Sequence, residues 1–120
     1  MMFRKLLNFK LLLIVSFLLS FKSSFADNKL VMITADYCIY CQIWEREIGE
    51  IYPKTDISKD FPLERIELDE HSIKNEPNNY DTKITPTFVF FKGKEEIGRI
   101  TGYSSAEMFW WQVDEILDLD

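Results

Sequence analysis

The pattern of hydrophobic and polar positions predicts a series of short strands and helices. A continuous apolar run at 30–33 indicates a buried first strand over 30–34, because strands covered on both faces lack polar alternation. The β-branched and aromatic run at 87–91 is the strongest strand signal, and a glycine-containing turn at 92–94 joins it to another strand at 96–101. We expect these two strands to form a hairpin. One more strand is indicated by Leu63, Ile66 and Leu68.

Two amphipathic helices are indicated by apolar residues at helical spacing. The first carries on one face Cys41, Trp44, Ile48 and Ile51. Pro53 is expected to end this helix, because a proline disfavours helical geometry in the residue before it. Residues 70–82 are rich in Asn, Asp and Lys, and we expect a short helix or an irregular loop there.

The second helix is expected to begin at Ser104, with Glu107 placed to complete a capping box. Its apolar face comprises Phe109, Val113, Ile116 and Leu117. The elements then follow in the order β-α-β-(α)-β-β-α, where the brackets mark 70–82. This order predicts an α/β fold with a mixed four-stranded sheet flanked by helices. The first two strands would be parallel through a right-handed crossover, and the hairpin would supply the antiparallel part.

The first 26 residues have the features of a secretion signal. Basic residues at 4, 5 and 10 precede an apolar stretch at 11–21. Ser24 and Ala26 place small side chains at the two positions that a signal peptidase inspects. We predict a signal peptide at 1–26, cleaved after Ala26, and one domain at 27–120. The apolar stretch is shorter than the roughly 20 residues that span a bilayer. The alternative is an uncleaved leader that anchors the protein.

Charge is distributed unevenly between the leader and the domain. All 20 acidic residues but only ten of the 14 basic residues lie in 27–120, so the domain carries a net charge of −10. Nucleic acid is therefore excluded as a partner class, because phosphates require a basic face. The simplest interpretation is a well-solvated surface, and the alternative is a preference for basic partner surfaces.

Cys38 and Cys41 are the only cysteines, and they stand between the first strand and the first helix. Two thiols at this spacing can close a small, reversible disulfide, and the unsatisfied N–H groups of a helix N-terminus favour a thiolate there. Closing so short a loop stabilises a fold little, which favours a redox role. A zinc site would need two further ligands, yet His71 is the only histidine. The pair predicts a thiol–disulfide oxidoreductase that needs no metal or organic cofactor.

The order strand, Cys-x-x-Cys, helix, and then Thr85-Pro86 before a late apolar strand resembles the thioredoxin superfamily over almost all of 27–120. The resemblance implies that Pro86 is cis and faces the cysteine pair. It also implies that the backbone of Thr85 pairs with an extended substrate segment, as an added strand would. Gly102 matches the position where a side chain would block the approaching substrate.

The chain also departs from that family. It passes almost directly from residue 27 into the cysteine-bearing strand, so a minimal thioredoxin-like fold is expected. Met32 stands where thioredoxins keep a buried aspartate that helps to deprotonate the second cysteine. Proton handling would then fall to water, to Asp36, or to another carboxylate such as Glu45.

The residues around the cysteines bear on substrate contact and redox poise. Tyr37 fills the position where the family has an aromatic residue, and Ile39 and Tyr40 lie between the cysteines, so all three are candidate substrate-binding residues. The dipeptide lacks the histidine of strongly oxidising periplasmic enzymes. Without an imidazolium to stabilise the thiolate, the pair is expected to be less oxidising and to act as a reductant.

Two longer stretches resemble a narrower group, the periplasmic thioredoxins of bacterial sulfur-oxidation (Sox) systems, of the SoxS type. They are Trp44–Glu47 with Ile51–Thr55, and Gly98–Tyr103 before Phe109-Trp110. Members of that group are associated with keeping the thiol of a sulfur-carrier protein reduced. The resemblance implies a periplasmic location and a protein disulfide as substrate. Because no soluble pool of small thiols can be assumed in that compartment, we expect a membrane thiol reductase as electron donor. We also expect a monomer.

The expected cycle assigns different roles to the two sulfurs. Cys38, partly exposed at the helix start, would attack a substrate disulfide, and the more buried Cys41 would resolve the mixed disulfide. Two alternatives remain from the residues. One is a periplasmic disulfide oxidase or isomerase with the same chemistry in the opposite direction, and the other is a non-catalytic binding module on the same scaffold.

Overall fold

A four-stranded sheet lies at the centre of the computed structural model, which describes residues 27–68 and 80–119 together with Lys5, Asn8 and Lys10. The strands are β1 (Lys29–Thr34), β2 (Leu63–Glu67), β3 (Thr87–Lys92) and β4 (Glu95–Thr101). Their order is β2-β1-β3-β4, with β1 parallel to β2 and antiparallel to β3. β3 and β4 form the expected hairpin. The prediction of a mixed four-stranded sheet is confirmed.

Both faces of β1 and β3 are buried, which explains their continuous apolar sequences. Leu30 and Met32 of β1 pack with Phe88 and Phe90 of β3 against the helices. On the opposite face the described residues form a second cluster, which contains Val31, Ile33, Tyr80, Val89 and Phe91. The alternation of the pleat thus divides the two strands between two cores.

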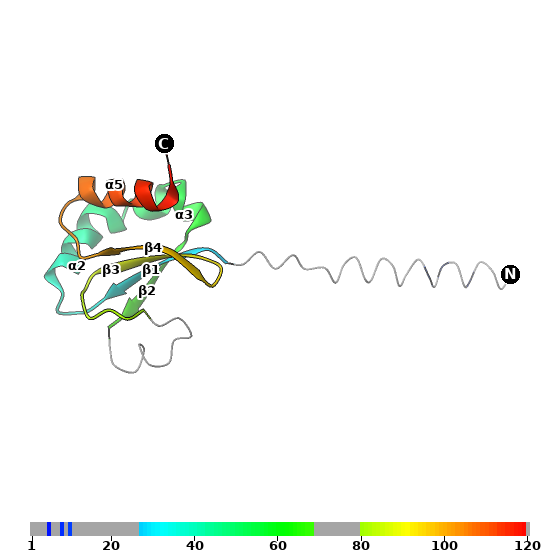
Figure 1. The fold of residues 1–120 in the computed structure, drawn as a ribbon, viewed down its shortest axis with the longest axis horizontal. Helices are drawn as coiled ribbons and strands as arrows, with labels where there is room; N and C mark the ends of the chain where they lie inside the picture. The colour runs from blue at the N-terminus through cyan, green and yellow to red at the C-terminus, as the bar shows by residue number, and fades with distance from the viewer. Residues whose placement is uncertain (1–4, 6–7, 9, 11–26, 69–79, 120) are drawn as a thin grey trace.

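The described helices lie over one face of the sheet (Figure 1). They are α2 (Ile39–Trp44), the π-helical turn η1 (Glu45–Gly49), the 3-10 turn η2 (Tyr52–Lys54), α3 (Ile57–Asp60) and α5 (Ala106–Leu117). In α5 the predicted apolar face is confirmed: Phe109 and Val113 are buried, and Ile116 and Leu117 pack against them as partly buried residues. α5 therefore anchors the C-terminal end of the described chain to the hairpin.

The first helix differs from the prediction beyond Ile48. Ile51, expected on the apolar face, is 46% exposed, while Tyr52 is fully buried and its hydroxyl donates to the carbonyl of Phe61 at 2.6 Å. The cause is η1, because a π-helical turn holds an extra residue and rotates the following positions around the axis. Pro53 does not end the helix either, since it lies inside the separate turn η2.

The start of α5 also differs from the prediction. Ser105, not Ser104, is the N-cap: its backbone is extended and its Oγ accepts a hydrogen bond from the amide of Met108 at 3.2 Å. Glu107 is then the second residue of the helix, so no capping box forms with Ser104. Both serines could cap a helix, and the path of the chain away from β4 decides between them.

Three expectations concern residues that lie wholly or mostly outside the described ranges: the leader at 1–26, His71, and the segment at 70–82. Residues 80–82 belong to neither helix nor strand. Within the described part of the chain, no helix combines the length and the apolar character that crossing a bilayer requires.

Candidate active site

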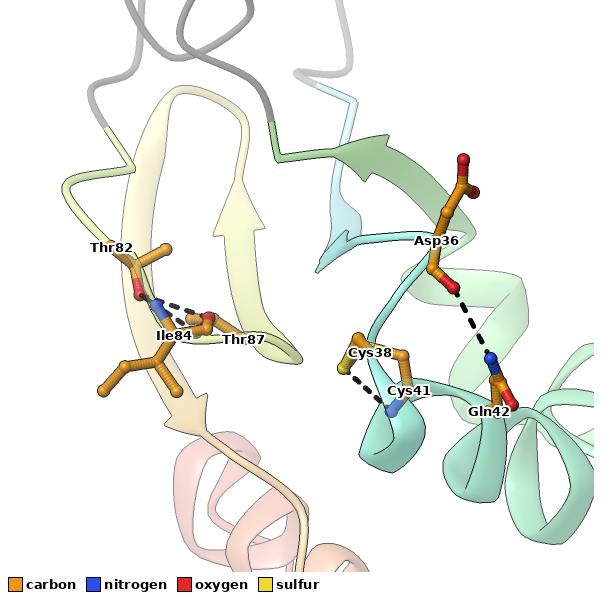
Figure 2. The surroundings of a disulfide bond; sticks show 7 residues. All are labelled: Asp36, Cys38, Cys41, Gln42, Thr82, Ile84 and Thr87. Atoms are coloured by element: carbon orange, nitrogen blue, oxygen red, sulfur yellow. Dashed lines mark hydrogen bonds between the residues drawn. A yellow bond between two sulfur atoms is a disulfide. The ribbon is translucent and has the colours of Figure 1, made fainter.

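The sheet register brings the two sequence motifs to the same edge of the fold. Ile33, near the end of β1, is paired with Thr87, the first residue of β3. The residues that follow β1 and those that precede β3 therefore leave the sheet side by side. Cys38 lies on the first of these segments and Pro86 on the second, and the two segments face each other in Figure 2.

Cys38 and Cys41 form a disulfide across the first turn of α2, with their Cα atoms 5.2 Å apart. Cys38 is the N-cap of the helix, and its Sγ accepts a hydrogen bond from the amide of Cys41 at 3.1 Å. Its own amide donates to the carbonyl of Ala35 at 3.1 Å, which holds the connection from β1 in a turn. The Cys41 N–H and the positive end of the helix dipole both favour negative charge at the Cys38 sulfur.

Cys38 is more buried than the sequence predicted. It keeps 6% of its surface exposed and Cys41 keeps 2%, so the expected order holds but Cys38 is a buried residue in the disulfide form. The disulfide folds its side chain against the helix start, where the apolar residues of the main core surround it. By contrast Tyr37, Ile39 and Tyr40 are 80%, 63% and 57% exposed, so a rim of large apolar side chains flanks the disulfide.

The peptide bond between Thr85 and Pro86 is cis. Pro86 is buried and Thr85 half-buried, and the carbonyl of Pro86 accepts a hydrogen bond from the amide of Gly102 at 2.7 Å. Gly102 has a φ of +81°, which a residue with a side chain rarely adopts. A Cβ at this position would meet no atom within 4 Å, so the surface beside Pro86 is open there.

Two threonine hydroxyls hold the segment before the cis bond (Figure 2). The amide of Ile84 donates to Thr82 Oγ1 at 3.2 Å, and the hydroxyl of Thr87 donates to the carbonyl of Ile84 at 2.6 Å. The hydroxyls themselves lie 3.1 Å apart. Both backbone polar groups of Ile84 are thus satisfied internally. Thr85 has no hydrogen bond to another described residue, and its backbone remains available to a substrate.

The structure bears on which group could take the proton from Cys41, for which water, Asp36 and Glu45 were the candidates. Met32 is fully buried, and none of the buried described residues is an Asp, Glu, Lys, Arg or His. Glu45 is engaged by Arg65, which donates to its two carboxylate oxygens, each at 2.9 Å. Asp36 is exposed, and its carboxylate points away from the disulfide while its carbonyl accepts from Gln42 (Figure 2). No buried carboxylate of the described part therefore replaces the aspartate that thioredoxins keep at the position of Met32.

Two supporting contacts were not predicted from the sequence. The hydroxyl of Tyr103 donates to Glu47 at 2.9 Å, and burial together with this bond raises the pKa of Tyr103 to about 12. This bond ties the connection after Gly102 to the helix that follows the cysteines. Tyr103 and Glu47 are 56 positions apart, so no local sequence pattern indicates this contact. The only available signal is that both side chains are polar and lie near the motifs that contain Gly102 and the two cysteines.

The second unpredicted contact holds the chain that leads to the cis bond. Arg99 of β4 donates to the carbonyl of Tyr80 at 2.7 Å and also forms an ion pair with Glu96. The hydrogen bond from Arg99 lowers the pKa of the Glu96 carboxyl. The segment between Tyr80 and Pro86 is therefore attached at both ends, by Arg99 and by the Gly102 amide. Among the described residues no group of three or more His, Cys, Asp or Glu side chains is placed to hold a metal ion.

Comparison with known proteins agrees with this geometry. The family model described as a thioredoxin-like domain matches residues 24–117. The crystal structure of the periplasmic thioredoxin SoxS from Paracoccus pantotrophus, in its reduced form, is similar with 29% identity and a TM-score of 0.65, covering 76% of this chain and 96% of that one. Thioredoxin O2 from Arabidopsis thaliana has the same fold at 24% identity and a TM-score of 0.57, covering 77% of this chain and 76% of that one.

A curated sequence relative is Thioredoxin H4-2 from Oryza sativa subsp. japonica. It is 27% identical over 85 residues, which are 68% of this chain and 60% of the rice protein. This chain thus spans less than two thirds of that relative. The family match covers most of the chain, including both cysteines and the cis-proline. The chain therefore belongs to the thioredoxin-like family, and it has a Cys-x-x-Cys disulfide between Cys38 and Cys41.

Proposed function

We propose that the protein is an exported reductase of protein disulfides that works in the periplasm. One observation carries the proposal: the Cys38–Cys41 disulfide opens α2 with its first sulfur bonded to a helix amide, and the sheet register brings the segment that contains the cis Thr85–Pro86 bond to the same edge of the fold. A disulfide that closes only a three-residue separation does little for stability, which leaves exchange chemistry as its role.

The cycle begins with the reduced protein. The Cys38 thiolate attacks one sulfur of the substrate disulfide, the substrate S–S bond breaks, and the other substrate sulfur leaves as a thiolate that takes a proton from solvent. Cys41 then loses its proton and attacks Cys38 in the mixed disulfide. This step restores the Cys38–Cys41 bond and releases the second substrate thiol. Two electrons have passed to the substrate, and the donor that returns them is proposed to be a membrane thiol reductase.

The surface around the disulfide suits an extended polypeptide as substrate. The free backbone groups of Thr85 can pair with a substrate strand, and the fixed backbone of Ile84 limits that pairing on one side. Tyr37, Ile39 and Tyr40 offer apolar contact next to the sulfurs. The open space at Gly102 allows the substrate to approach Pro86.

The periplasmic assignment and the direction of electron flow have separate support. The leader-like sequence at 1–26 and the similarity to a periplasmic thioredoxin both favour export. The absence of a histidine between the cysteines favours a reductant. By its similarity to SoxS, we propose a sulfur-carrier protein of a sulfur-oxidation system as the natural substrate.

Trapping of the mixed disulfide tests the proposed activity. Cys41→Ser should accumulate a covalent complex with the natural partner, because Cys38 can attack but nothing resolves the product. Cys38→Ser is the matched control and should trap nothing. Complexes that survive alkylation, disappear with dithiothreitol and contain a periplasmic thiol protein would support the proposal. If Cys41→Ser traps no more protein than Cys38→Ser, the reductase cycle is wrong.

The reduction potential tests the direction. A value near about −250 mV would be that of a reductase, whereas a value near about −120 mV would be that of an oxidase. Equilibration of the purified protein with glutathione or dithiothreitol buffers, followed by alkylation and mass spectrometry, measures it directly.

A further inference from the structure

The outer face of α5 carries exposed apolar side chains that the fold itself does not use. Trp111 is 57% exposed and Met108 is 46% exposed, whereas the neighbouring Trp110 stacks on Tyr52 with ring centroids 6.3 Å apart. Trp111 makes no ring contact with another described residue. Met108 and Trp111 are three positions apart on the helix, so they form one exposed apolar patch, and such patches are typical of contact surfaces.

Acidic side chains surround that tryptophan. Residues three and four positions apart are neighbours on a helix surface, and at these distances from Trp111 lie Glu107, Asp114 and Glu115. All three are exposed, and none forms an ion pair with another described residue. The helix contains no Lys, Arg or His. An indole ring among three unpaired carboxylates is a favourable environment for a cation, through cation–π attraction and charge pairing together.

The surface is also hollowed beside the tryptophan. Ser105, Glu107, Met108 and Trp111 line a depression of about 510 Å³ at the N-terminal end of α5. Such a depression can take one or two side chains of a partner. It begins three residues after Gly102, on the chain that leads away from the candidate active site.

We infer that this α5 surface, defined by Glu107, Met108, Trp111, Asp114 and Glu115, is a docking site for a basic protein segment. The segment would place an arginine or lysine over Trp111 and an aliphatic side chain in the depression. The negative charge of this surface favours a basic segment over two other possible occupants, a second copy of the protein and a membrane. A second copy packed through the same helix would bring carboxylates against carboxylates, and a membrane with anionic lipids would be repelled for the same reason.

Nuclear magnetic resonance on the purified ¹⁵N-labelled protein tests the inference. The probe is a short synthetic peptide of alternating arginine and leucine, and the reporter is the indole N–H signal of Trp111, identified by its loss in Trp111→Gln. Addition of the peptide should shift this signal saturably. Two control peptides, with glutamate in place of arginine and with serine in place of leucine, should bind at least five-fold more weakly.

Variants separate this surface from the general negative charge of the protein. Neutralising the three carboxylates in E107Q/D114N/E115Q should weaken peptide binding about ten-fold. The matched control E50Q/D60N/E95Q removes three exposed carboxylates elsewhere and should change binding less than two-fold. Met108→Gln should weaken binding, whereas Ile51→Gln, which alters an apolar residue that is also 46% exposed, should not.

Several results would overturn the inference. They are an unchanged Trp111 signal, equal binding of the glutamate peptide, or equal losses in the two charge variants. Binding to phosphatidylglycerol vesicles, or a dimer of the protein alone in sedimentation that Trp111→Gln abolishes, would replace the basic segment with another occupant. Trp111→Gln should keep its reduction of insulin disulfides, so the docking site and the proposed reductase activity are judged by separate measurements.

Discussion

Thr87 links the core of the sheet to the segment that is proposed to meet substrate. Its side chain is fully buried, and its hydroxyl donates to the Ile84 carbonyl at 2.6 Å. A hydrogen bond of this kind contributes about 0.5–1.5 kcal/mol, and it holds the Ile84 backbone in place. Because Ile84 directly precedes Thr85, the hydroxyl also determines where the free backbone groups of Thr85 lie.

Replacing Thr87 with Val should therefore impair contact with protein substrates more than it impairs thiol chemistry. We expect the KM for a protein disulfide to rise several-fold, with kcat for the small disulfide 5,5′-dithiobis(2-nitrobenzoate) nearly unchanged. Thr87→Ser keeps the donor and should restore the KM. Equal losses on both substrates, or no rescue by serine, would mean that the hydroxyl only supports folding.

Tyr103 should make the protein less stable at alkaline pH. Its pKa is raised from 10.0 to about 12, first by burial and then by the bond to Glu47. A group whose folded pKa is raised adds stability below its unfolded pKa and loses it as the pH rises through the folded value. The stabilisation is thus complete below pH 10 and falls away between pH 10 and pH 12.

Tyr103→Phe should make unfolding less sensitive to pH in that window. Urea denaturation at pH 8, below the window that the raised pKa defines, and at pH 10 and 11 measures the slope. Burial raises the pKa of Tyr52 as well, so part of the slope should remain. Tyr37→Phe, at a position that is 80% exposed, serves as the control. A slope unchanged in Tyr103→Phe but altered in Tyr37→Phe would contradict the assignment.

Among the elements, α5 depends on a close approach to the hairpin at Gly98. A Cβ on Gly98 would lie 2.7 Å and 2.8 Å from two carbon atoms of Ile116, which is shorter than van der Waals contact. The missing side chain lets the helix rest directly on β4. Phe109 and Val113 of this helix lie in the main core, and Ile116 packs against that core.

Gly98→Ala should destabilise the protein by about 1–3 kcal/mol, because an overpacked interface forces Ile116 or the helix to move. Ile116→Ala alone should also destabilise it by leaving space. The double variant should cost less than the sum of the single changes, since alanine at 116 makes room for the new Cβ. Urea denaturation of the four proteins measures the coupling, and strict additivity would show that the two residues do not compete for space.

At the scale of the whole molecule, charge repulsion opposes folding. Residues 27–120 carry 20 acidic against ten basic residues. Exposed ion pairs on the described surface, such as Arg65 with Glu45, are worth only about 0.2–1 kcal/mol each. The folded state brings these like charges closer together than the unfolded chain does.

Sodium chloride should therefore stabilise the protein. The urea midpoint should rise between low salt and physiological ionic strength, because the screening length shortens to about 8 Å. The charge-neutralised variant E107Q/D114N/E115Q should show a smaller rise. A midpoint that falls with salt would mean that the attractive pairs outweigh the repulsion.

The cysteine pair and the mixed sheet could be predicted because their signals are local or periodic. Cys38 and Cys41 are three positions apart, and each strand has its own apolar run. The cis bond at Pro86 was expected only from the resemblance to the thioredoxin superfamily, because a proline before a strand is by itself equally compatible with a trans bond. The cap at Ser105, the exposure of Ile51 and the burial of Cys38 were predicted wrongly. Each depends on how one element packs on another, which a single stretch of sequence does not encode.

By itself the sequence determined the order of the elements, the redox-type pair and the acidic charge of the domain, since these follow from residue types at short spacing. The tertiary structure decided which residues share the site. The sheet register placed Thr87 opposite Ile33, Arg99 reached the Tyr80 carbonyl, and Tyr103 reached Glu47 across 56 positions. It also decided that Trp110 faces inward and Trp111 outward. The physical reason is that long-range contacts form only when all the layers pack together, so their energies depend on the whole fold.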